Sequence, residues 1–96
     1  MKKQLKEARE LVSLIWDEYN KINNSEGTVG YTYHDDLRTQ ADCSNQEYDD
    51  MEVYVEEKDK ECVEHCLDNL RKTLTYCKAV IALQKAEANL PPSVFG

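Results

Sequence analysis

Apolar residues recur at helical spacing in two parts of this 96-residue chain, and this pattern constrains the fold more than any other feature. Side chains three or four residues apart lie on one face of a helix. In the N-terminal part these positions are Leu5, Ala8, Val12, Ile15, Tyr19 and Ile22. In the C-terminal part they are Val63, Leu67, Leu70, Leu74, Cys77 and Ile81. The pattern predicts two amphipathic helices and an all-α fold.

The first predicted helix covers about residues 2–23. The run Asn23-Asn24-Ser25-Glu26-Gly27 follows it, and Asn and Gly tolerate the left-handed backbone that commonly ends a helix. Leu11, Leu14 and Trp16 widen the apolar stripe beyond that of a two-stranded coiled coil. We therefore expect this helix to pack on more than one neighbour.

A second, longer helix is predicted over about residues 45–89. Ser44-Asn45-Gln46-Glu47 matches a capping box, and Asn89-Leu90-Pro91-Pro92 ends the pattern because proline cannot continue a helix. The charged run 56–60 interrupts the apolar face, so we expect a kink, a break or an exposed overhang there. The two helices predict an antiparallel helical hairpin or a small bundle, in a single domain over residues 1–96.

The segment 28–42 has no clear helical pattern and is predicted to be a loop. A structureless connection of this length would be unusual in so small a domain. Some residues in it alternate as in a short strand; they are Val29, Tyr31 and Tyr33. An α+β fold with a short hairpin from 28–34 and 50–56 is therefore the alternative.

Negative charge is concentrated in the middle of the chain. Residues 35–68 hold thirteen Asp and Glu against three basic residues, whereas the whole chain has a net charge of −7. If 45–89 is one helix, six acids and one tyrosine fall on the face opposite the apolar residues, over about 32 Å. We expect this face and the adjacent Asp49 to bind a partner. The predicted partner-binding residues are Glu47, Asp49, Asp50, Tyr54, Glu57, Glu61, Glu64 and Asp68.

The charge of this face indicates which partners it suits. It would repel nucleic acid and anionic membranes. One net negative charge per roughly 4 Å of the predicted helix approaches the density of a nucleic-acid strand, about 3.4 Å per phosphate. Carboxylates accept paired hydrogen bonds from arginine, and charge steers the approach of a basic partner.

The sequence therefore predicts a non-enzymatic acidic protein that inhibits a basic nucleic-acid-processing protein by presenting a nucleic-acid-mimicking face. The target would be a nuclease, a restriction enzyme or a CRISPR-type complex. In composition, a short acidic chain with segregated carboxylates, the protein is similar to phage-encoded inhibitors of host defence nucleases and to nuclease immunity proteins. That likeness implies an inhibitory role and assigns no residue.

Two other functions fit the sequence. One is a helical oligomerisation or scaffold module, because two helices cannot cover apolar seams this wide. A homo-oligomer is expected under this reading and under the inhibitor reading. The other is an oligomeric nucleotide-sequestering protein, which would need cationic and aromatic residues together. The cluster that offers both is Lys2, Lys3, Lys6, Arg9 and Tyr19.

Chemistry-bearing motifs are weak in this chain. Cys43, Cys62, Cys66 and Cys77 lack the paired spacing of a zinc site, and cysteine on an apolar face is more often a core residue, so we expect no metal. We expect no catalytic residue and no cofactor, because there is no nucleophile motif and no Gly-rich phosphate loop. With no run of 18 apolar residues and no signal-peptide pattern, the expected location is cytoplasmic.

Overall fold

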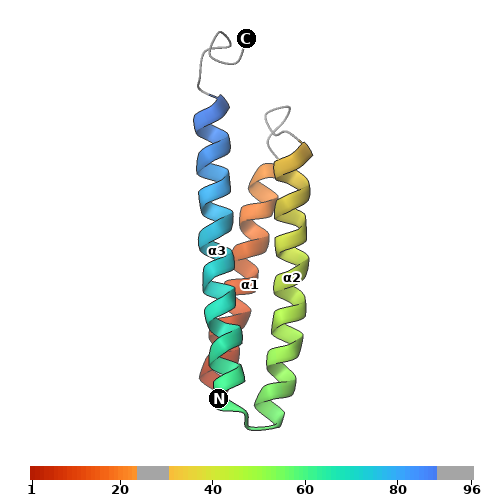
Figure 1. The fold of residues 1–96 in the computed structure, drawn as a ribbon, viewed down its shortest axis with the longest axis vertical. Coiled ribbons are helices and arrows are strands. Elements are labelled where there is room, and N and C mark those ends of the chain that lie inside the picture. Colours follow the sequence, from red (N-terminus) through yellow and green to blue (C-terminus); the bar gives the residue numbers. More distant parts are fainter. Residues whose placement is uncertain (24–30, 89–96) are drawn as a thin grey trace.

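The computed structural model describes residues 1–23 and 31–88, which form three helices (Figure 1). They are α1 (Lys2–Asn23), α2 (Tyr31–Glu56) and α3 (Lys60–Ala88). α1 and α3 run in the same direction and α2 runs antiparallel to both, so that each helix packs on the other two. The bundle measures 56 × 20 × 17 Å. The predicted all-α small bundle is confirmed.

One apolar core lies between the three helices. Most residues predicted to face inward are buried in it or packed against it, although Leu14 is 46% exposed. The buried apolar residues are Ala8, Ile15, Tyr19, Leu37, Ala41, Met51, Val63, Cys66, Leu67, Leu70, Cys77, Val80 and Ile81. The wide seams that two helices could not cover are covered within one chain by the third.

The loop predicted for 28–42 is largely wrong, because α2 begins at Tyr31. The capping box is also wrong: Ser44 is buried inside α2, and its Oγ donates a hydrogen bond of 2.6 Å to the carbonyl of Ala41. The alternative hairpin is excluded because 31–34 and 50–56 are helical. Residues 28–30 and the predicted helix end at 89 lie outside the described residues.

A reversal at 57–59 divides the predicted long helix into α2 and α3. Lys58 has a φ of 58°, in the left-handed region. The N–H of Asp59 bonds to the carbonyl of Tyr54 at 2.9 Å and that of Lys58 to the carbonyl of Val55 at 3.1 Å, the two bonds of a Schellman motif. Asp59 Oδ1 then accepts a bond of 3.1 Å from the N–H of Cys62 and caps α3. The break expected within 56–60 is confirmed, and it is a full reversal.

Candidate protein-binding surface

The reversal separates the predicted acidic face into two parts. Glu47, Asp49, Asp50 and Tyr54 lie on α2, and Glu57 lies in the turn. The remaining predicted residues, Glu61, Glu64 and Asp68, lie on α3. Because α2 and α3 are antiparallel, the acids do not form one continuous stripe. That part of the prediction is wrong, since it assumed that the helix continued through Lys58.

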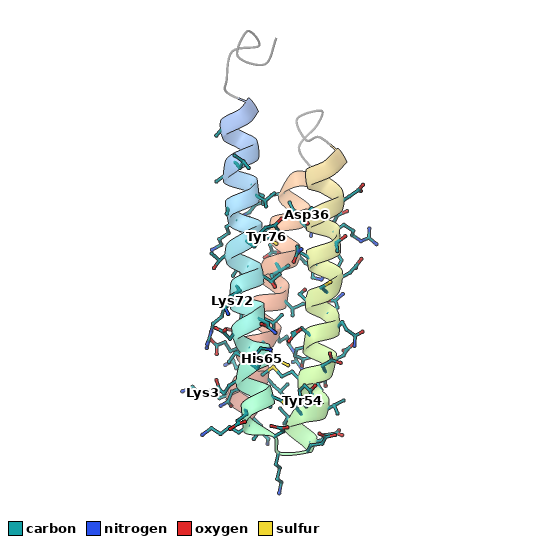
Figure 2. All side chains as sticks on the ribbon, in the orientation of Figure 1. Lys3, Asp36, Tyr54, His65, Lys72 and Tyr76 are labelled. Carbon is teal, nitrogen blue, oxygen red and sulfur yellow. The ribbon has the colours of Figure 1, made fainter. Side chains whose placement is uncertain are left out.

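Part of the predicted set does meet where α2 and α3 join near the turn. Tyr54 is half-buried there, near the lower end of α2 in Figure 2. The pKa of its phenol is raised, first by the neighbouring Cys62, then by burial and by the charges of Asp50 and Glu57. Asp50 and Glu57 are thus close enough to Tyr54 for their charges to act on its phenol.

Two thiols of α3 lie beside these acids. The pKa of the Cys62 thiol is raised by a hydrogen bond to Asp59, by burial and by nearby charges that include Glu61. Cys66, one turn further along, is buried, and burial together with a hydrogen bond to Glu47 raises its pKa to about 12. A protonated thiol is a poor nucleophile and a poor metal ligand. This junction therefore favours packing over thiol chemistry.

Glu47 belongs to the interface between α2 and α3. Its side chain is half-buried and accepts a hydrogen bond of 3.1 Å from Asn69 Nδ2, in addition to its bond with Cys66. A carboxylate held by two groups of the neighbouring helix is satisfied within the protein. Of the predicted binding residues, Glu47 therefore has the clearest structural role.

Glu64 and Asp68 also have partners on the bundle surface. Gln4 of α1 donates a long hydrogen bond of 3.4 Å to Glu64. Asp68 pairs with Lys72 at 2.9 Å, and this hydrogen bond lowers the pKa of the Asp68 carboxyl. Figure 2 places Lys72 on α3, higher along the helix than His65. The charge of Asp68 is compensated by Lys72, and Arg71 lies near enough to Glu64 for the two charges to interact, so the outward face of α3 is mixed in charge.

α2 alone accounts for the net charge of the whole protein. It contains eight acids and one arginine, a net of −7, whereas α1 and α3 each have five basic and four acidic residues, a net of +1. Five of its acids are exposed along the length from residue 42 to 56, and we call them the α2 acidic face. They are Asp42, Asp49, Asp50, Glu52 and Glu56.

Few cations oppose the α2 acidic face. Arg38, the only basic residue of α2, pairs with Asp42 at 3.4 Å. Asp50 accepts a hydrogen bond of 3.0 Å from the neutral amide of Gln46. Within residues 1–23 and 31–88, no lysine or arginine forms an ion pair with Asp49 or Glu56. Arg9 of α1 also lies near enough to Glu52 for the two charges to interact. Among the described residues, the acids of this face that no cation compensates are therefore Asp49, Asp50 and Glu56.

The sequence carried a signal for this face that the prediction did not use. Asp35, Asp42, Asp49 and Glu56 recur every seven residues, a spacing that keeps side chains on nearly one side of a helix. Treating 28–42 as a loop removed half of this repeat. The prediction therefore included Asp49 and Asp50 but missed Asp42, Glu52 and Glu56.

In the cluster considered for nucleotide binding, the aromatic residue Tyr19 does not lie beside the basic residues. Tyr19 is buried in the core, ten residues and about 15 Å along α1 from Arg9. Arg9 instead donates a hydrogen bond of 3.2 Å to the hydroxyl of Tyr48 on α2. The stacking platform that a nucleotide would need is therefore not formed by Tyr19.

Residues 1–23 and 31–88 contain no group of three or more His, Cys, Asp or Glu side chains placed to hold a metal ion. In the same part of the chain, no helix combines the length and apolar character needed to cross a membrane. No family model, curated protein or solved structure matches the chain. The functional argument therefore rests on the contacts and charges of its own residues.

Proposed function

We propose that this protein is a non-enzymatic acidic binding protein that inhibits a basic, nucleic-acid-processing protein by presenting a carboxylate-rich, nucleic-acid-mimicking face. Its target would be a nuclease, a restriction enzyme or a CRISPR-type complex. The observation that carries the proposal is the α2 acidic face, which lies on a helix with the net charge of the entire chain and only one basic residue.

The arrangement of ion pairs supports a binding role for this charge. α1 and α3 follow the usual pattern of a solvated helix, with Lys21 paired to Glu18 at 3.0 Å and Lys72 paired to Asp68 at 2.9 Å. Opposite charges three or four residues apart stabilise a helix, and like charges destabilise it. α2 has this compensation only at Arg38 and Asp42. Folding alone gives no reason to collect so many acids on one helix.

The spacing of the charge supports a mimic of a nucleic-acid backbone. α2 has 26 residues, so its net charge is spread at about one per 5–6 Å, compared with about 3.4 Å per phosphate along a strand. The charge is also held on a rigid helix, which lowers the entropy lost on binding. An arginine-lined groove could therefore contact several carboxylates along one line.

The first step of the test is capture of partners from a lysate of the source cells at low salt. The proposal predicts recovery of a basic nucleic-acid-processing protein that is released by added DNA or RNA, and by moderate salt that screens exposed charges. A captured partner that nucleic acid does not displace would contradict mimicry.

Two matched variants then locate the binding face. Asp49→Asn with Glu56→Gln removes two charges from α2, and Glu10→Gln with Asp17→Asn removes an equivalent exposed pair from α1. Both pairs are seven residues apart. We expect the α2 variant to raise the Kd of the partner at least about tenfold, equivalent to ~1.4 kcal/mol, and the α1 variant to change it little. Equal effects of the two variants would refute a role for α2.

A further inference from the structure

We draw no further inference here: the strongest candidate, the exposed apolar surface patch of Ala79, Ala82 and Leu83 on the second half of α3, carries none because nothing in the described part of the structure shows what covers it.

Discussion

α2 and α3 pack side by side and have similar lengths, 26 and 29 residues, but their residues are distributed in opposite ways. The inward face of α3 is rich in large apolar side chains such as Leu67 and Leu70, whereas that of α2 includes the small residues Ala41 and Ser44. The outward face of α2 is strongly acidic, whereas α3 has nearly balanced charge. The difference indicates that α3 contributes more to the core, and that α2 is distinguished by its surface.

The two helices also differ in the side-chain contacts that tie them to α1. α3 is tied to α1 by Arg71, whose Nη2 lies 2.9 Å from both carboxylate oxygens of Glu7. α2 is tied to α1 by Trp16 Nε1, which donates a bond of 3.0 Å to Asn45 Oδ1. These contacts leave Asp49 and Glu56 uninvolved. These two acids are thus separate from the contacts that hold the bundle together, whereas Glu52 lies near Arg9 of α1.

The largest expected effect concerns the two inward faces. Leu70 on α3 and Ser44 on α2 are both fully or almost fully buried. Leu70→Ala should lower the free energy of unfolding by about 2–5 kcal/mol, because it leaves a cavity in the core. Ser44→Ala should cost less than about 1 kcal/mol, because the hydroxyl bonds only to a carbonyl of its own helix.

Urea unfolding followed by circular dichroism measures both variants. Leu83→Ala is the control for α3, because this leucine lies on the same helix but is half exposed. It should stay within about 0.5 kcal/mol of the wild type. Similar losses for Ser44→Ala and Leu70→Ala would break the comparison between the two helices.

The interface between α2 and α3 should make stability depend on pH in the alkaline range. Burial, with a hydrogen bond to Glu47, raises the pKa of the Cys66 thiol from 9.0 to about 12. Because the folded-state pKa is the higher one, the contribution of this thiol to the free energy of unfolding is fully present below pH 9. That contribution is lost as the pH rises from 9 towards 12.

Unfolding free energies at several pH values from 8 to 11, for the wild type and for Cys66→Ala, isolate this effect from the titration of tyrosines and lysines. The wild type should lose stability more steeply than the variant. Equal slopes for the two proteins would mean that the Cys66 thiol is not held neutral at the interface.

The sequence predicted the helices whose inward faces are made of large apolar residues. Leu67, Leu70 and Ile81 identify α3, and the alternating seam identifies α1. The first half of α2 was missed because, among residues 35–43, the buried apolar positions are Leu37 and Ala41, too few to establish a period. The turn was located by its interrupted seam, but the reversal was not foreseen, because Lys58 is not a residue typical of the left-handed conformation.

The candidate site was predicted in part for the same reason. The acidic region was recognised from composition, which does not depend on the fold. Which acids share a face does depend on the fold. The prediction assumed one continuous helix, and it therefore placed Asp50 on the same face as Glu64 and Asp68, which lie on α3. Contacts across the bundle were also beyond reach, so Glu47 was assigned to binding although Asn69 and Cys66 hold it in place.

The most direct test asks whether the α2 acidic face serves the fold at all. Unfolding midpoints at low salt would be compared for Asp49→Asn with Glu56→Gln and for Glu10→Gln with Asp17→Asn. We predict that the α2 variant is the more stable of the two, because it relieves repulsion and removes an acid from the C-terminal end of a helix. The difference should shrink at high salt. If the α2 variant is instead the less stable, the acids of α2 serve the fold, and the account of α2 as a binding face is contradicted.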